Sequence, residues 1–194
     1  MFTGIIEAIG KVVEIKTEGT NKHFCFSSPV SHELKTDQSL AHNGVCLTVT
    51  KASNGMHWVT AVDETLKKSN LGLLTPGDEV NLERCMIANG RFDGHVVQGH
   101  VDQTGKCVSV EDANGSWIYK FEYDPKHGNV TVEKGSVSIN GVSLTCFESK
   151  ENGFTVAIIP YTYEHTNFHS IKAGTAVNLE FDIIGKYVKR LLGK

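Results

Sequence analysis

The stretch NGVCLTV at residues 43–49 returns almost unchanged as NGVSLTC at residues 140–146. When the chain is shifted by 97 positions, residues 39–83 lie over residues 136–180, and 14 of these 45 positions are identical. Nearer the start the best shift is 95, so an insertion or deletion of two residues separates the two matching blocks. A repeat of this length indicates that the chain consists of two homologous halves.

The repeat also sets the expected domain organisation. A chain of 194 residues can hold one large domain or two domains of about 95 residues each, and typical domain sizes permit either. The internal similarity favours two domains. We place them at residues 1–90 and 91–183, followed by a tail at residues 184–194.

Each half has the pattern of a β-rich domain. Short apolar or alternating runs such as GKVVEI, CLTVT and DEVNLE are separated by Asn-Gly or Pro-Gly pairs. The Asn-Gly pairs at 54–55, 114–115 and 152–153 favour tight turns, because such turns need residues with positive φ. Short strands at this spacing predict a small antiparallel barrel in each half.

Helices are expected at only three places. One or two turns follow Asp63, which is suited to cap a helix, and one or two follow Pro160, which is suited to the first helical position. In the tail, apolar residues recur at helical spacing opposite basic ones. They are Ile184, Tyr187, Val188, Leu191 and Leu192. A helix of three turns is marginal alone, so this face packs either on its own barrel or in an oligomer contact.

The composition is that of a water-soluble protein with small-molecule or protein partners. The hydrophobic share is 40%, and no apolar run reaches the length that a membrane-spanning helix needs. A net charge of −3 argues against a nucleic-acid surface. The opening MFTGIIEAIGKVVEI has no features of a secretory signal and is expected to form the first strand. The five cysteines contain no C-x-x-C pair, which fits reduced thiols in the cytoplasm rather than a disulfide framework or a cysteine zinc site.

Several motifs occur together in a fixed order. They are MFTGIIE, SLAHNGVCLTV, GRFDGHVVQGHVD, SVSINGVSLTC, and the VNLE that closes both halves. In this combination the whole chain resembles the riboflavin synthase family. The resemblance implies an all-β fold of two tandem homologous six-stranded antiparallel Greek-key barrels plus a short C-terminal helix.

The resemblance also implies an activity. Members of this family transfer a four-carbon unit between two molecules of 6,7-dimethyl-8-ribityllumazine, which yields riboflavin and 5-amino-6-(D-ribitylamino)uracil, without a metal or an organic cofactor. They are homotrimers held partly by their C-terminal helices. Each barrel binds one lumazine, and the working site forms between the N-terminal barrel of one subunit and the C-terminal barrel of a neighbour. Association with a lumazine synthase is left open.

A duplicated barrel suits this chemistry, because two similar pockets can hold two identical substrates close together. The two copies should agree where they bind and differ where they react. Thr48 and Thr145 are shared and can hydrogen-bond a pteridine edge, as can the backbone around the two Asn-Gly turns of the repeat. The copies differ at Cys46 and Ser143, because only a thiol becomes a soft nucleophile without an activating base.

A second difference lies at His100, whose counterpart in the first half is Ile5. A histidine titrates near neutral pH and can take a proton from the acidic 7-methyl group of a lumazine. His95 lies five residues earlier, and on a strand the two side chains would point to opposite faces. We therefore expect no shared metal site and a structural role for His95.

Matched position by position, the resemblance assigns three sets of residues. One lumazine is placed against Gly4, Ile5, Ile6, Ser143, Leu144, Thr145, Ile159, Pro160, Tyr161, Thr162, Tyr163 and Glu164. The other is placed against Cys46, Leu47, Thr48, Thr60, Ala61, Val62, Asp63, Glu64, Thr65, Gly99, His100, Val101 and Lys134. The expected catalytic residues are Cys46, His100, Ser143, Thr145, Ser39 and Asp182. For Asp182 two roles stay open, since it either caps the tail helix or holds a catalytic hydroxyl or histidine in place.

Two other classes of protein were weighed. Lumazine- and flavin-carrying antenna proteins share the two-barrel frame and bind a ligand without turning it over. The presence of all four residues Cys46, His100, Ser143 and Thr145 favours the enzyme. A flavin reductase barrel would need a nicotinamide-binding domain with a Gly-rich strand-turn-helix segment, and the sequence contains none.

Overall fold

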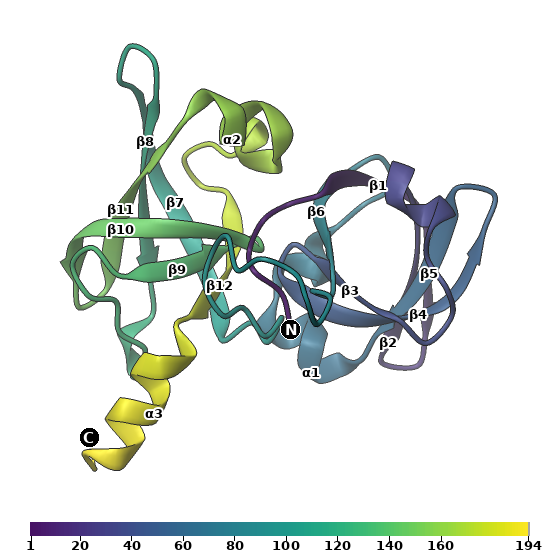
Figure 1. Ribbon diagram of the computed structural model, residues 1–194, viewed down its shortest axis with the longest axis horizontal. Coiled ribbons are helices and arrows are strands. Elements are labelled where there is room, and N and C mark those ends of the chain that lie inside the picture. Colours follow the sequence, from purple (N-terminus) through teal and green to yellow (C-terminus); the bar gives the residue numbers. More distant parts are fainter. Residues whose placement is uncertain (194) are drawn as a thin grey trace.

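The computed structural model describes residues 1–193, which form two closed six-stranded antiparallel barrels lying side by side (Figure 1). In the first barrel the strands are neighbours in the order β1-β2-β5-β4-β3-β6. Their bounds are β1 (Ala8–Glu18), β2 (Asn21–Ser27), β3 (Ser39–His42), β4 (Val45–Ser53), β5 (Met56–Ala61) and β6 (Glu79–Arg84).

The second barrel repeats this order as β7-β8-β11-β10-β9-β12. Its strands are β7 (Gln103–Asp112), β8 (Trp117–Tyr123), β9 (Ser136–Ile139), β10 (Val142–Lys150), β11 (Gly153–Ile158) and β12 (Ala176–Phe181). The predicted fold class of two tandem six-stranded barrels is confirmed.

Alternation along the strands fills each barrel with apolar side chains. Phe24, Phe26 and Leu40 are fully buried in the first barrel, and Tyr119 and Phe121 are almost fully buried in the second. Burying a large apolar side chain contributes roughly 1.5–3 kcal/mol, so these residues account for much of each barrel's stability. Within residues 1–193 no helix is both long enough and apolar enough to cross a bilayer.

Short helices connect the strands at equivalent places in the two halves. The α-helices are α1 (Asp63–Lys68), α2 (Pro160–His165) and α3 (Ile183–Leu191), and 3-10 helices cover Pro29–His32, Asn70–Leu73, Pro125–His127 and Asn167–Ser170. Pro160 occupies the start of α2 as predicted. Asp63 does not cap α1, because Val62 holds the cap position. Asp63 instead lies in the first turn and pairs with Lys67 at 2.5 Å.

Two of the three predicted Asn-Gly turns are confirmed. Both residues of the pairs at 54–55 and 114–115 have positive φ and close hairpins. At 152–153 the prediction is wrong, because Gly153 already pairs with Lys150 and the turn consists of residues 151–152. Near this turn, the residue with positive φ is Glu148, which lies at the register irregularity of β10.

The first strand begins later than the sequence predicts. Residues 1–7 leave the first barrel and run between the two barrels, where the N-terminus lies in Figure 1. Phe2 pairs there with Val97, through N–O distances of 2.7 and 3.1 Å. The segment that precedes β1 and the segment that precedes β7 therefore meet as a two-residue bridge between the barrels.

The repeated Asn-Gly motif lies at the interface between the barrels. The side-chain amide of Asn81 donates to the carbonyl of Asn140 at 2.9 Å, and that of Asn178 donates to the carbonyl of Asn43 at 2.8 Å. Asn43 and Asn140 are each only 2% exposed. These amides and carbonyls are bonded to one another across the interface, and the expectation that the backbone around the two turns contributes to binding stays a prediction. The motif is shared because it joins the barrels.

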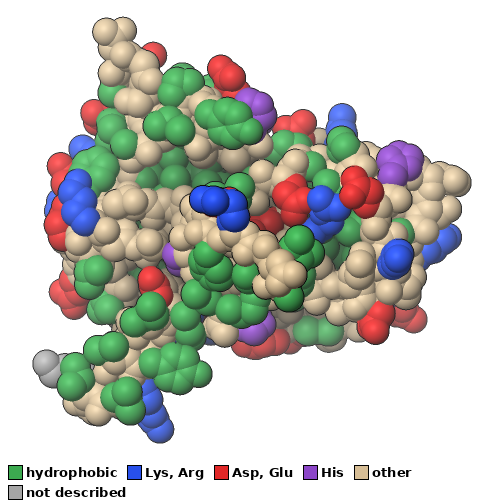
Figure 2. Space-filling model, viewed as in Figure 1, with side chains coloured by type: hydrophobic (Ala, Val, Ile, Leu, Met, Phe, Trp, Pro, Cys, Tyr) green, Lys and Arg blue, Asp and Glu red, His purple; other side chains and the backbone are tan. Residues whose placement is uncertain are grey.

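The tail helix α3 extends away from the second barrel (Figure 1). Asp182 caps it by accepting a hydrogen bond from the backbone N–H of Ile184 at 2.9 Å. The apolar side chains on the helix gather in the open at the end of the molecule (Figure 2), and Leu191 is 84% exposed. On the other side Lys186 pairs with Asp102 at 2.7 Å. Of the two alternatives for the apolar face, packing on its own barrel is therefore wrong.

Candidate functional site

A cavity of about 390 Å³ lies between the first barrel and the segment that precedes β7. It brings together six of the predicted residues from three separate parts of the chain: Cys46, Glu64, Thr65, Gly99, His100 and Val101. The cavity is completed by Val45, Lys68, Ser69, Asp102 and Lys186. Six residues that lie far apart along the chain, and that the resemblance assigned to one lumazine, are therefore found around one cavity.

Cys46 is fixed at the wall of this pocket. Its backbone N–H donates to the carbonyl of Gly99 at 2.8 Å. Burial raises the pKa of its thiol, while the facing Ser39 hydroxyl acts in the opposite direction. The thiol is thus protonated at neutral pH and offers a hydrogen-bond donor, unless a bound ligand or a base removes its proton.

The other residues predicted to surround the same lumazine as Cys46 differ in orientation. Leu47 and Ala61 belong to the core of the barrel, so only their backbone groups are available to a ligand. Thr48 is exposed, two positions after Cys46 on β4, and therefore on the same face of the strand. The hydroxyl of Thr60 is bonded to His23 at 2.9 Å.

Lys134 is separate from this group. It lies in the loop before β9 on the second barrel, and its ammonium sits 5.2 Å from the centre of the Phe147 ring. It does not line the cavity that contains Cys46. A role for Lys134 at the first-barrel pocket therefore requires a neighbouring subunit.

The second barrel repeats the arrangement. The backbone N–H of Ser143 donates to the carbonyl of Gly4 at 2.8 Å, as that of Cys46 donates to Gly99. Gly4 and Gly99 have φ values of +79° and +81°, and a Cβ on either would lie 2.5 Å from the Cβ of Ser143 or Cys46. Both positions therefore require glycine, because the crossing segment must approach the strand closely.

Sequence reasoning missed the partner of Ser143. The Nδ1 atom of His95 lies 2.7 Å from the Ser143 hydroxyl oxygen. Burial lowers the pKa of His95, and nearby Asp182 acts in the opposite direction. A neutral His95 can accept the proton of Ser143, which makes this hydroxyl a stronger base or nucleophile than an isolated serine.

The reason for the miss is local. The segment from 98 to 102 is not a strand, so the argument that placed His95 and His100 on opposite faces of one is wrong. Glycines at 94 and 99 were the available signal, because glycine is unfavourable in a strand interior and marks bends or close backbone approaches.

Aromatic side chains line the second barrel near α2. Tyr163 stacks on Trp117 with ring centres 3.8 Å apart, and Tyr161 stacks on His165 at 4.1 Å. Ile6 and Leu144 pack on the core of the barrel. Ile159 and Tyr161 are largely exposed, like Thr145 on β10. Trp117, which was not among the predicted residues, belongs to this aromatic group through its contact with Tyr163.

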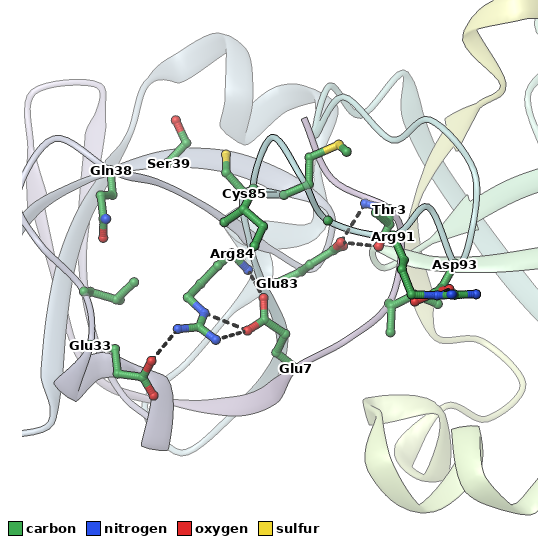
Figure 3. Close-up of a pocket in the computed structure, with 15 residues that line it drawn as sticks. Thr3, Glu7, Glu33, Gln38, Ser39, Glu83, Arg84, Cys85, Arg91 and Asp93 are labelled. Carbon is green, nitrogen blue, oxygen red and sulfur yellow. Dashed lines mark hydrogen bonds and ion pairs between the residues drawn. The ribbon is translucent and has the colours of Figure 1, made fainter.

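A larger cavity, of about 680 Å³, is drawn in Figure 3. Of the predicted residues it contains only Ile5 and Ser39. At its floor Arg84 is held between Glu7 and Glu33, each at 2.6 Å (Figure 3). Because its main cation is already paired on both sides, this cavity has the character of a structural ion-pair network rather than of a reaction site.

Comparison with known proteins agrees with this duplicated geometry. Residues 3–85 and residues 98–182 each match the family model of the lumazine binding domain. The chain belongs to this family. The crystal structure of LumP complexed with riboflavin has the same fold, with a TM-score of 0.86 at 18% identity over 93% of this chain and 99% of that chain.

Relatives in the lumazine-binding family are similar over the whole length. The riboflavin synthase of Actinobacillus pleuropneumoniae is 43% identical, covering 100% of this chain and 91% of that protein. The riboflavin synthase of Bacillus subtilis (strain 168) is 41% identical with the same coverage. The match spans both barrels and the tail helix.

Proposed function

We propose that the protein is a riboflavin synthase, which converts two molecules of 6,7-dimethyl-8-ribityllumazine to riboflavin and 5-amino-6-(D-ribitylamino)uracil. One observation carries this function: each barrel presents an equivalent strand position, Cys46 or Ser143, against a crossing glycine segment. Two equivalent pockets for two identical substrates are what this reaction needs. The full-length similarity to riboflavin synthases supports the same conclusion.

The two pockets differ in the groups that can move protons. In the first, His100 lies in the same cavity as Cys46 and can take a proton from the 7-methyl group of a lumazine. In the second, the Ser143 hydroxyl is bonded to His95 and can add to the ring or accept a proton. Equal binding with unequal chemistry is expected when one substrate donates four carbons and the other accepts them.

The assembly that we propose is a homotrimer in the cytoplasm. The exposed apolar face of α3 supports an oligomer contact, because contiguous exposed apolar patches mark interaction sites. In a trimer the first-barrel pocket of one subunit faces the second-barrel pocket of its neighbour, which brings two lumazines together. Lys134 would then reach the first-barrel pocket from a neighbour. Association with a lumazine synthase stays a prediction.

Substitutions of the two reactive residues in the first pocket test this function. Cys46→Ala and His100→Ala are each expected to lower kcat by about 100-fold or more, because acid–base groups contribute on that scale. The affinity for 6,7-dimethyl-8-ribityllumazine should change much less. Cys25→Ala removes a buried thiol outside the pocket and is the matched control. Unchanged turnover in a normally folded variant would remove that residue from the mechanism.

A further inference from the structure

Two buried carboxylates occupy equivalent places at the ends of the last strands of the two barrels. Glu83 on β6 is 4% exposed and Glu180 on β12 is 3% exposed. Neither residue forms a salt bridge within 4.0 Å among the residues that the structure describes. Buried carboxylates are costly unless they are well bonded, so both require an explanation.

Both carboxylates are bonded to backbone N–H groups of a crossing segment. Glu180 accepts hydrogen bonds from the backbone N–H groups of Gln98 at 2.6 Å, Gly99 at 2.9 Å and His100 at 2.8 Å. These three residues form the segment that precedes β7. Bonds from several N–H groups to one charged acceptor are strong, and they fix the backbone that donates them.

Glu83 makes the same contacts in the other half. It accepts hydrogen bonds from the backbone N–H of Thr3 at 2.6 Å, the hydroxyl of Thr3 at 2.9 Å and the backbone N–H of Gly4 at 3.0 Å. Figure 3 shows the Glu83 side chain directed at Thr3. Each carboxylate thus holds the segment that precedes the first strand of its own barrel.

Each of the two segments, however, contacts the opposite barrel. The segment held by Glu180 meets Cys46 of the first barrel, through the carbonyl of Gly99. The segment held by Glu83 meets Ser143 of the second barrel, through the carbonyl of Gly4. The backbone bonds at Cys46 and at Ser143 therefore each depend on a segment that a carboxylate of the other barrel holds.

We propose that Glu180 is a positioning residue for the first-barrel pocket and that Glu83 is a positioning residue for the second-barrel pocket. The inference rests on the proposed lumazine pockets. A glutamine at either position would direct an NH₂ group at N–H donors and lose the charge, which should free the crossing segment. Lumazine binding is then expected to weaken in the barrel that does not contain the substituted residue.

Blocking one pocket at a time makes this pattern measurable. Thr65 lines the first pocket, and Thr162 is its counterpart in the repeat. Thr65→Trp and Thr162→Trp should each reduce bound 6,7-dimethyl-8-ribityllumazine from two to one per chain in equilibrium dialysis. Glu180→Gln should weaken the remaining site at least tenfold in the Thr162→Trp background and leave it within twofold in the Thr65→Trp background. Glu83→Gln should show the reverse.

The outcomes separate the inference from the function. If the unsubstituted protein binds no lumazine, or if the Trp variants still bind two, the proposed pockets fail. If the pockets hold but each glutamine weakens the site of its own barrel, or both sites equally, the crossed positioning is wrong.

A second pair of variants leaves both carboxylates in place and changes only the crossing segments. Their effect on binding therefore does not come from unfolding caused by the loss of a buried carboxylate. Gly99→Ala and Gly4→Ala place a Cβ 2.5 Å from Cys46 and Ser143, respectively. They should reproduce the pattern of Glu180→Gln and Glu83→Gln. Thermal unfolding of every variant is measured alongside binding.

Discussion

Two histidines in the core of the first barrel make its stability depend on pH. His42 and His57 are 0% exposed, and their Nε2 atoms lie 2.9 Å apart. The Nδ1 atom of His42 faces the carbonyl of Leu40 at 3.1 Å and must donate to it, so its Nε2 is an acceptor. His57 therefore donates from Nε2, and its Nδ1 accepts from the Ser31 hydroxyl at 2.8 Å. Protonation of His42 would set two N–H groups against each other at this contact, and protonation of His57 would place a charge in the core and reverse its bond to Ser31.

Acid should therefore destabilise the barrel. Burial lowers the pKa of His57 from 6.5 to about 4, and burial together with His57 lowers the pKa of His42 well below its ordinary value. Because the unfolded chain binds these protons more readily, the stabilisation is present above pH 6.5 and is lost as the pH falls towards 4. For His57 alone the loss over this interval is about 3 kcal/mol, since one pKa unit corresponds to roughly 1.4 kcal/mol.

This loss is measured by urea unfolding at several pH values. The free energy of unfolding is compared between the native chain and His57→Gln. The raised pKa values of Glu83 and Glu180 act oppositely, because their contribution is present at low pH and lost as the pH rises. Both proteins contain Glu83 and Glu180, so their contribution cancels when the free energies of unfolding of the two proteins are subtracted at each pH. The native chain should lose about 3 kcal/mol more than His57→Gln between pH 6.5 and 4. If the two proteins lose the same free energy of unfolding between these pH values, His57 does not cause the acid sensitivity. The same conclusion follows if His165→Gln, which removes an exposed histidine, has an equal effect.

Two further predictions concern the interfaces. Gly44→Ala should destabilise the protein by about 2 kcal/mol or more in urea unfolding, because its Cβ would lie 2.7 Å from the backbone nitrogen of Gly141 at the barrel interface. Gly19→Ala, which also has positive φ but nothing within 4 Å, should cost less, and an equal cost would contradict the interface argument. Leu191→Asp on α3 should reduce the mass in light scattering from three chains to one. Arg190→Ala is the control, and an unchanged mass for Leu191→Asp would exclude the helix contact.

Much of the fold was predictable because it depends on local signals. The repeat predicts two like domains, the alternation of apolar residues predicts strands, and Pro160 marks the start of α2. The pattern of the tail predicts α3 and its apolar face. These features follow from residues that are close together in the sequence, so they can be predicted without knowing which distant residues are in contact.

The remaining features depend on contacts that the sequence does not encode locally. The apolar residues at 1–7 continue smoothly into β1, so nothing in the pattern shows that they cross to pair with Val97. The bond between Asn43 and Asn178 joins residues 135 positions apart. The contact between His95 and Ser143 was not foreseen, because a strand was assumed where glycines bend the chain.

The proposed reaction requires that the protein alone convert lumazine to riboflavin. The purified protein, stripped of bound ligand, is mixed with 6,7-dimethyl-8-ribityllumazine without added metal or nucleotide, and absorbance and fluorescence are followed. We expect half a mole of riboflavin for each mole of lumazine consumed. Tight binding of lumazine without any riboflavin would contradict it and would make the protein a carrier.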